Sequence, residues 1–353
     1  MKKTKAGTLV FDGREPEAKA AVAAAAEILQ QGGLVAFPTE TVYGLGANAL
    51  DPQAVRRIFA AKGRPQDNPL IVHISNAAEL YRLAKNIPRE AWLLAERFWP
   101  GPLTLVLEKQ PHVPPETTGG LDSVAVRVPR HPLTLALLSV AALPVAAPSA
   151  NLSGRPSPTT AEHVLADLDG RIDAVLDGGP CDVGVESTVL DIRQGRPRIL
   201  RPGGVTQEEL VAALQRDCPL VSWEENNNSP PPSPGMKYLH YAPRAPLYLY
   251  KGRPEAVVQK MQEAAAREIS RGRRVGLLVS AESAAFFPSG RVIVLGGRNE
   301  PHKAAAHLFA ALRAFDAEGV DVILAEGFPP RGVGMALMNR LQKAAGPRVI
   351  RVE

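Results

Sequence analysis

The sequence is poor in cysteine and has no long hydrophobic run. Its two cysteines, Cys181 and Cys218, lie far apart and have no neighbours at the spacing of a zinc site. Neither a disulfide framework nor a metal cluster is therefore predicted. No stretch of about 18 consecutive apolar residues occurs, so a membrane is not an expected partner. The basic start of the chain is not followed by the apolar core of a secretory signal, and the cytoplasm is the expected location.

Several common catalytic motifs are also missing. The chain has no GxxxxGK sequence followed by Ser or Thr, which excludes a P-loop as an ATP site, and no GxGxxG between a strand and a helix. It contains neither a GxSxG elbow nor an HExxH pair. These absences weigh against the usual hydrolase and dehydrogenase functions.

The composition that remains is that of a globular protein. With 45% hydrophobic and 22% charged residues, the chain resembles neither a disordered nor a membrane protein. Its 353 residues exceed one typical domain and can bury two hydrophobic cores. The formal net charge of +5 favours anionic partners, but it is modest for this length and does not by itself indicate nucleic-acid binding.

Residues 1–220 mix strand and helix patterns in an irregular order. Asp51 as N-cap and Pro52 at the first helical position predict a helix to about residue 61. Further patterns predict helices at 15–31, 77–85, 89–98, 133–142, 160–168 and 207–215, and strands at 34–37, 70–74, 103–107, 124–128, 145–147, 174–176, 188–192 and 198–200. This order favours an α/β domain with a twisted, mixed sheet and flanking helices.

A smaller second domain is predicted after a proline-rich segment. Residues 221–246 contain three consecutive asparagines and a proline cluster, which is typical of an extended linker. Strands at 247–250, 275–279, 292–295 and 322–325 then alternate with helices at 255–269, 304–315 and 335–344. This regular alternation predicts a Rossmann-like α/β domain with a parallel sheet over residues 247–353.

The stretch VAFPTETVYGLGANA, residues 35–49, begins as a buried strand and then changes character. We expect Pro38 to end the strand and the next residues to form a loop before the helix at Pro52. Gly44 and Gly46 would let the backbone turn closely toward a ligand, with Tyr43 at the mouth of the pocket. The alternative is a plain glycine turn with Glu40 solvated.

One basic segment is a candidate for ligand binding. In AAKGRPQDNPLIVHIS, Lys62 and Arg64 can present an ammonium and a guanidinium to one polyphosphate, with Asn68 nearby. A solvated basic loop is the alternative. His73 lies on the following strand, where a lone histidine is usually a core or edge residue.

An arginine within a strand and polar groups at the borders of other strands are further candidates. Arg127 lies in the apolar strand SVAVRVP and needs either a buried acid or an anionic ligand; both explanations stay open. After the strand ending at Ala147, the sequence PSANLSGRPSPTT supplies hydroxyl and amide groups that suit a nucleotide, although a turn and an N-cap explain part of it. Polar residues at further strand borders are Ser187 and Arg201.

Six motifs in order resemble one family. FPTETVYGLGANA, KGRPQDNPLIVHI, GPLTLVL, VAVRVP, APSANLSGRPSPT and ESTVLD look like the YrdC-type domain of threonylcarbamoyl-AMP synthases over about residues 15–215. SPGMKYLHYAP and GVGMALMNRLQKAA resemble the longer, two-domain Sua-type members, which extends the likeness to nearly the whole chain.

The resemblance implies a reaction and its partners. L-Threonine, bicarbonate and ATP, with Mg²⁺ held mainly by the ATP phosphates, would give threonylcarbamoyl-adenylate and pyrophosphate. A separate tRNA threonylcarbamoyl transferase complex would then use the product to modify adenosine 37 of tRNAs that read codons beginning with A.

The resemblance also implies roles for particular residues. Lys62 and Arg64 would be catalytic, and no residue would bind a metal directly. The threonine pocket would be lined by Thr41, His73, Arg127, Ala147 and Ser187. ATP would be surrounded by Lys62, Arg64, Asn68, Ser123, Ser149, Asn151, Ser157 and Arg201, with Tyr241 of the linker closing over it.

Two other functions compete with this interpretation. An RNA-binding module without synthase activity would explain the positive charge, and weak RNA binding could also accompany the synthase, but aromatic residues interleaved with Lys and Arg are lacking. The carbamoyl-transfer domain of hydrogenase-maturation proteins is of the same type. Those proteins carry a zinc-finger segment, for which two cysteines do not suffice.

Overall fold

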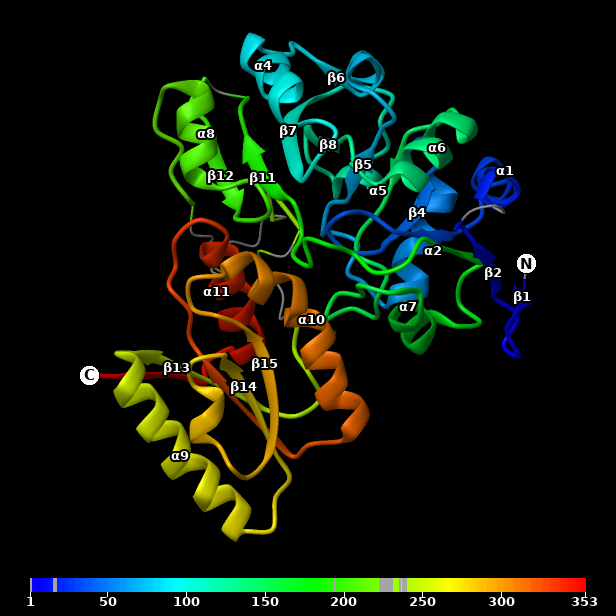
Figure 1. The fold of residues 1–353 in the computed structure, drawn as a ribbon. Coiled ribbons are helices and arrows are strands. Elements are labelled where there is room, and N and C mark those ends of the chain that lie inside the picture. Colours follow the sequence, from blue (N-terminus) through cyan, green and yellow to red (C-terminus); the bar gives the residue numbers. More distant parts are fainter. Residues whose placement is uncertain (1, 15–17, 194, 222–230, 235, 237–239) are drawn as a thin grey trace. The chain divides into compact units, whose positions relative to one another are not determined.

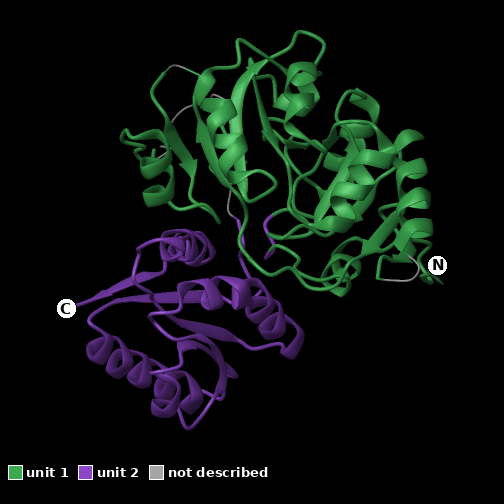
Figure 2. Ribbon diagram, turned by 45° about the horizontal axis from the view of Figure 1, so that its top comes forward, with its two compact units in different colours: residues 1–153, 157–237 green, residues 154–156, 238–353 purple. Residues whose placement is uncertain are grey.

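The computed structural model describes residues 2–14, 18–193, 195–221, 231–234, 236 and 240–353. The chain forms two compact units (Figure 2). The first comprises residues 1–153 and 157–237, and the second comprises residues 154–156 and 238–353. Much of the predicted linker, at 222–230, 235 and 237–239, lies outside the described residues.

The first unit is built on one mixed sheet. Its strands run in the order β1-β2-β10-β3-β4-β9-β5-β8-β7-β11-β12, and β6 pairs with β7. The strands are β1 (Lys2–Lys3), β2 (Leu9–Asp12), β3 (Val35–Phe37), β4 (Gly44–Asn48), β5 (Ile71–His73), β6 (Ala84–Lys85), β7 (Leu103–Lys109), β8 (Ser123–Arg127), β9 (Val145–Ala146), β10 (Ala174–Asp177), β11 (Thr188–Asp191) and β12 (Arg198–Arg201). Parallel and antiparallel pairs both occur, which confirms the predicted mixed α/β class.

The helices of this unit follow most of the predicted patterns, but residues 84–85, predicted as helical, form a strand, and the short helix at 115–118 was not predicted. They are α1 (Ala18–Gln30), α2 (Pro52–Lys62), α3 (Leu80–Leu83) after the short helix η1 (Ala77–Glu79), α4 (Arg89–Phe98), α5 (Pro115–Thr118), α6 (Pro132–Ala141), α7 (Ala161–Leu168) and α8 (Gln207–Leu214) (Figure 1). Helix α2 begins as predicted, because the Asp51 carboxylate accepts the backbone N–H of Gln53 and Pro52 needs no partner there. Gly63 ends the helix in the left-handed conformation.

The two faces of the sheet bury different clusters. The larger cluster joins one face to α2, α4 and α7. On the opposite face, α1 and α6 cover the region of β2, β10 and β3. Further along that face, strands β5, β8, β7, β11 and β12 carry a small apolar cluster: Ile71, Val106, Ala125, Val189 and Leu200. We call this cluster the apolar strip; His73 of β5 and Arg127 of β8 belong to the same strands as two of its members, Ile71 and Ala125.

One prediction about the segment after Phe37 is wrong. Residues 44–48 are not a loop but strand β4, which pairs antiparallel with β3. Gly46 serves packing here: a Cβ atom on it would come within 2.5 Å of the Phe37 ring and 2.7 Å of Val145. Tyr43 is fully buried, and its hydroxyl donates to the carbonyl of Gly179 at 2.7 Å, so its ring does not lie at a pocket mouth.

The second unit is a five-stranded, fully parallel sheet in the order β15-β14-β16-β13-β17. Its elements are β13 (Leu247–Gly252), α9 (Pro254–Ser270), β14 (Val275–Ser280), η2 (Ala284–Phe286), β15 (Arg291–Gly296), α10 (Pro301–Glu318), β16 (Val322–Glu326), α11 (Val333–Ala345) and β17 (Val349–Val352). The predicted Rossmann-like alternation is confirmed, and Figure 1 shows α9 on one side of this sheet and α10 and α11 on the other. Strand β17 was not predicted.

Candidate active site

Strands β5 and β8 place two predicted residues side by side. His73 and Arg127 are paired across these parallel strands, so their side chains leave the sheet on the same face. By the same two-residue alternation, they share that face with Ile71 and Ala125 of the apolar strip. The backbone N–H of Ala147 donates to the carbonyl of Ile71 at 2.8 Å, which brings the end of β9 to the same place.

Arg127 has a buried acid beside it. Its side chain is 4% exposed, and its Nη2 lies 2.7 Å from Oε1 of Glu40, whose side chain is 2% exposed. The Arg127 Nη1 donates to the Thr41 hydroxyl at 3.0 Å, and Nε donates to the Gly101 carbonyl at 3.1 Å. A solvated Glu40 is therefore wrong, and of the two explanations left open for Arg127 the structure provides the acid.

Glu40 connects several segments around this arginine. Its Oε2 accepts the backbone N–H of Arg130 at 3.0 Å, and its carbonyl accepts the N–H of Val183 at 2.8 Å. Burial alone would raise the pKa of Glu40, but the positive charge of Arg127 and the Arg130 N–H outweigh burial and hold the pKa below its usual value. Glu40 is thus an ionised carboxylate at neutral pH.

His73 is held in its neutral form. Burial and the nearby charge of Arg127 lower its pKa from 6.5 to about 3. The His73 ring meets the Phe37 ring edge to face, with the ring centres 5.9 Å apart. A neutral imidazole offers one donor and one acceptor nitrogen, which suits a hydroxyl group.

The lowered pKa of His73 predicts how stability depends on pH. Below pH 6.5 the unfolded chain protonates His73 while the folded protein does not, so stability falls as the pH drops from 6.5 toward about 3. At one pH unit below 6.5, the free energy of unfolding is lower by about 1.4 kcal/mol than at a pH where His73 is neutral in both states. In denaturant unfolding, the stability of His73→Gln should decrease less with falling pH than that of wild type. His112→Gln, a change at an exposed position, should show the same decrease as wild type. A His73→Gln variant that loses stability as steeply as wild type would contradict the assignment.

Lys62 connects the end of helix α2 to residues 148–160, which we call the serine-rich loop and which contain several residues predicted to bind ATP. This lysine is the last residue of α2 and is 2% exposed. Its Nζ donates to the carbonyls of Ser149 and Asn151, both at 2.5 Å. The backbone N–H of Ser153 donates in turn to the Lys62 carbonyl at 2.9 Å. The ammonium is therefore fixed by neutral groups at this loop.

Arg64 and Asn68 lie in the turn that follows. Gly63 reverses the chain after α2, and Arg64 Nη2 then donates to the carbonyls of Asn68 at 3.4 Å and Pro69 at 3.2 Å. Both side chains are at least nine-tenths buried, so the alternative of a solvated basic loop is wrong. Buried guanidinium and ammonium groups within three residues can both act on one polyphosphate.

Backbone hydrogen bonds join the two halves of the predicted site. The segment after Thr41 lies against the serine-rich loop, because Tyr43 N donates to Pro158 O at 2.9 Å and Ala150 N donates to Tyr43 O at 2.8 Å. Gly44 also forms an isolated bridge with Ser149. The segment that follows Thr41 and the loop that carries Ser149 and Asn151 are therefore neighbours in the structure.

Ser187 and Arg201 form a third group at the same face. Arg201 donates through Nη2 and Nε to the Ser187 carbonyl at 2.9 and 3.2 Å, and the Ser187 hydroxyl lies 2.8 Å from that of Thr104. Glu186, next to Ser187, accepts the Ser157 hydroxyl at 2.6 Å. Ser157 thereby ties the serine-rich loop to the start of β11.

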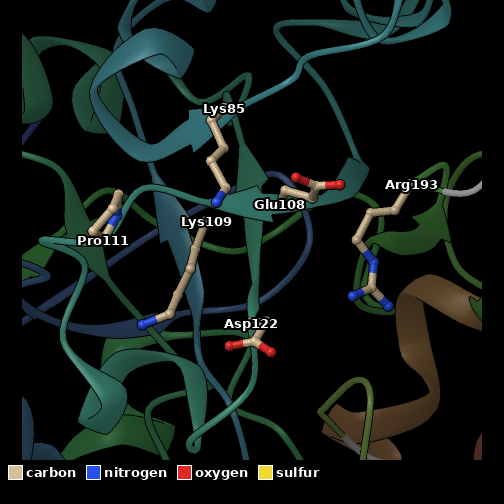
Figure 3. A pocket seen from close by; sticks show the side chains of 6 residues that line it. All are labelled: Lys85, Glu108, Lys109, Pro111, Asp122 and Arg193. Carbon is tan, nitrogen blue, oxygen red and sulfur yellow. The ribbon is translucent and has the colours of Figure 1, made fainter.

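Ser123 lies further from these groups. It is four residues before Arg127 on β8, about 13 Å along the strand, and it pairs with Glu108. Glu108 lines a cavity of about 410 Å³ with Lys85, Lys109, Pro111, Asp122 and Arg193 (Figure 3). Charges of both signs meet there. None of the predicted site residues lines this cavity.

Tyr241 belongs to the second unit. It is 5% exposed, adopts a left-handed backbone conformation with φ of 64°, and its ring centre lies 5.2 Å from that of Phe309. The guanidinium of Arg340, a fully buried residue of α11, lies 5.4 Å from the Tyr241 ring centre. Within its unit, this tyrosine is thus anchored to α10 and α11. Its closing over ATP stays a prediction.

Sequence reasoning assigned no role to Glu40 or Glu186. A signal for Glu40 was available: Arg127 required a buried acid or an anion, and Glu40 lies in a motif already marked as functional. Glu186 immediately precedes the predicted Ser187. In both cases the partner is distant in sequence, so pairing could not be read from spacing.

The described residues contain no set of three or more His, Cys, Asp or Glu side chains that could hold a metal ion. Among the same residues, no helix is both long and apolar enough to cross a membrane.

The fold and the site define a class of protein. In the first unit, buried cations, hydroxyls and the acids Glu40 and Glu186 gather at a mixed α/β sheet, and a parallel α/β unit follows in the sequence. A family model described as Telomere recombination, for the Sua5, YciO and YrdC proteins, matches residues 27–203, and the model of the threonylcarbamoyl-AMP synthase C-terminal domain matches residues 205–346.

Comparison with individual proteins agrees with the family models. The chain is 52% identical to the threonylcarbamoyl-AMP synthase of Bacillus subtilis, over 94% of each chain, and 49% identical to that of Pyrococcus abyssi, over 98% of this chain and all of the relative. The crystal structure of P. abyssi Sua5 complexed with L-threonine superposes with a TM-score of 0.92 at 47% identity, covering 98% of this chain and all of the other. The chain belongs to the threonylcarbamoyl-AMP synthase family and is an enzyme of the nucleotidyltransferase type, as the sequence motifs predicted.

Proposed function

We propose that this enzyme condenses L-threonine, bicarbonate and ATP to threonylcarbamoyl-adenylate, releasing pyrophosphate. The observation that carries the proposal is the hydrogen-bonded link between two groups of buried residues. One group, around Arg127 and His73, suits a hydroxy amino acid, and the other, around Lys62 and Ser149, suits a nucleotide. A condensation needs both substrates side by side in one site.

The threonine site would use the residues around β5 and β8. Arg127 is suited to the carboxylate, and neutral His73 or the Thr41 hydroxyl to the side-chain hydroxyl. Ala147 would contribute its backbone and Ser187 its hydroxyl. The structure of the P. abyssi relative with bound L-threonine supports an amino-acid site in a protein of this fold.

ATP would bind beside threonine on the serine-rich loop. Lys62, Arg64 and Arg201 would offset the negative charge that develops on the phosphates during attack of the carbamate on the α-phosphorus. The other proposed contacts are Asn68, Ser123, Ser149, Asn151, Ser157 and Tyr241. The described residues lack a carboxylate cage, so Mg²⁺ would arrive with ATP, held by phosphate oxygens and water, and would neutralise part of their charge.

The product would serve tRNA modification in the cytoplasm. Threonylcarbamoyl-adenylate carries an activated acyl group, so a downstream tRNA threonylcarbamoyl transferase complex must consume it, giving N6-threonylcarbamoyladenosine at position 37 of tRNAs that read codons beginning with A. Weak direct binding of RNA by the basic chain is a further proposal. It predicts an affinity that decreases steeply with salt.

Pyrophosphate release tests the proposed reaction. With purified full-length protein, ATP and Mg²⁺, we expect release that depends on both threonine and bicarbonate, and loss of the signal when either is omitted. Release that is independent of threonine or bicarbonate would contradict the proposal. Salt-sensitive RNA binding without threonine-dependent turnover would favour the RNA-binding alternative instead.

A further inference from the structure

Two charged atoms beside the proposed threonine site have unused hydrogen-bonding capacity. Glu40 Oε1 and Arg127 Nη2 form an ion pair at 2.7 Å, and neither atom has a further hydrogen-bond partner within the described residues. A carboxylate oxygen can accept more than one hydrogen bond and Nη2 carries two N–H groups, so each atom has capacity beyond this ion pair. Both side chains are more than nine-tenths buried, where hydrogen-bonding capacity that stays unused is costly.

Both groups are also held firmly in place. Arg127 is fixed through Nε by Gly101 and through Nη1 by Thr41. Glu40 is fixed through Oε2 by the Arg130 N–H and through its own carbonyl by Val183. Glu40 Oε1 and Arg127 Nη2 are thus held in place by the other atoms of their side chains. They form a preorganised pair of one anion and one cation.

Such a pair matches a zwitterion. An α-amino acid carries a carboxylate and an amino group on one carbon, so the two groups can reach adjacent protein atoms of opposite charge. We propose that Glu40 binds the amino group of the amino-acid substrate while Arg127 binds its carboxylate. This inference rests on the proposed function. It gives Glu40, which has no assigned role in that function, the task of binding the amino group of the substrate.

The ionised state of Glu40 defines what it can do there. Because Arg127 and the Arg130 N–H keep Glu40 as a carboxylate, it accepts an N–H from the amino group in either of that group's protonation states. Glu40 would therefore orient the nitrogen for carbamate formation. It also discriminates against carboxylic acids that lack an amino group, since they would bring a second negative charge next to Glu40.

A ligand with and a ligand without the amino group separates this role from a structural one. We would measure equilibrium binding of L-threonine and of (R)-3-hydroxybutanoate, which keeps the carboxylate and hydroxyl. Wild type should prefer threonine by about tenfold or more, the usual range for a bond to a charged group. Glu40→Gln should lose most of this preference, chiefly through weaker binding of threonine. Thr41→Val should weaken the binding of both ligands by a similar factor.

Each outcome has a defined meaning. If Glu40 only positions Arg127, Glu40→Gln will weaken both ligands equally and keep the preference, which overturns the inference. If Glu40→Gln does not fold, Glu40→Asp replaces it. The aspartate side chain is shorter by one methylene, so its carboxylate lies further from the amino group and the preference for threonine should fall. An unchanged preference overturns the inference. If wild type binds neither ligand, the proposed function fails instead.

Discussion

Replacing Arg127 with alanine is expected to raise the threonine concentration needed for half-maximal rate by about a hundredfold, the loss for one buried charged contact. The requirement for ATP should change by less than about threefold, because Arg127 is bonded to the Thr41 and Gly101 segments and not to the Lys62 loop. Initial rates of pyrophosphate release, with each substrate varied in turn, measure both quantities. Equal losses for the two substrates would contradict the assignment.

Stability has to be followed together with these rates. Removing Arg127 leaves Glu40 as a buried unpaired charge, and breaking one side of such a pair costs about 3–5 kcal/mol. Arg127→Lys keeps the charge without the guanidinium fork and should give an intermediate threonine requirement. The matched control is Arg130→Ala: its side chain is 56% exposed and only its backbone N–H contacts Glu40. That variant should behave as wild type does.

Replacing Lys62 with methionine is expected to lower kcat by about a hundredfold to a thousandfold, the range for removing one group that stabilises developing charge. Methionine keeps the apolar stem of the side chain but removes the ammonium that lies at Ser149 O and Asn151 O. The threonine requirement should change little. The rate at saturating ATP and threonine gives kcat, and varying each substrate in turn gives its apparent KM.

A lysine with similar bonding elsewhere serves as the control for Lys62. Lys109 Nζ also donates to a backbone carbonyl, that of Val113, at 2.9 Å, but it lines the separate cavity in Figure 3. Lys109→Met should keep full activity. Similar losses for both variants would show that general charge, rather than the position of Lys62 at the nucleotide loop, accounts for the effect.

Local patterns predicted most of the elements and missed the short or unusual ones. Helix α2 was predicted from Asp51 and Pro52 because an N-cap and a first-turn proline act within a few residues. Strand β4 was missed because its two glycines resemble a turn, and only the close approach of Phe37 and Val145 explains Gly46. Strand β6 was missed because its two residues fall within the helix predicted at 77–85, and the four-residue strand β17 was not predicted either.

By itself, the sequence determined the class, the two α/β units and the family, because motifs, caps and alternation are local features. It also marked Thr41, Lys62, Arg127, Ser149 and their companions as candidates. Only the tertiary structure decided which of them touch. The pairing of Arg127 with Glu40, and the bonds of Lys62 to the loop at Ser149, join residues more than 80 positions apart. Such contacts depend on strand order and register, which no local pattern records.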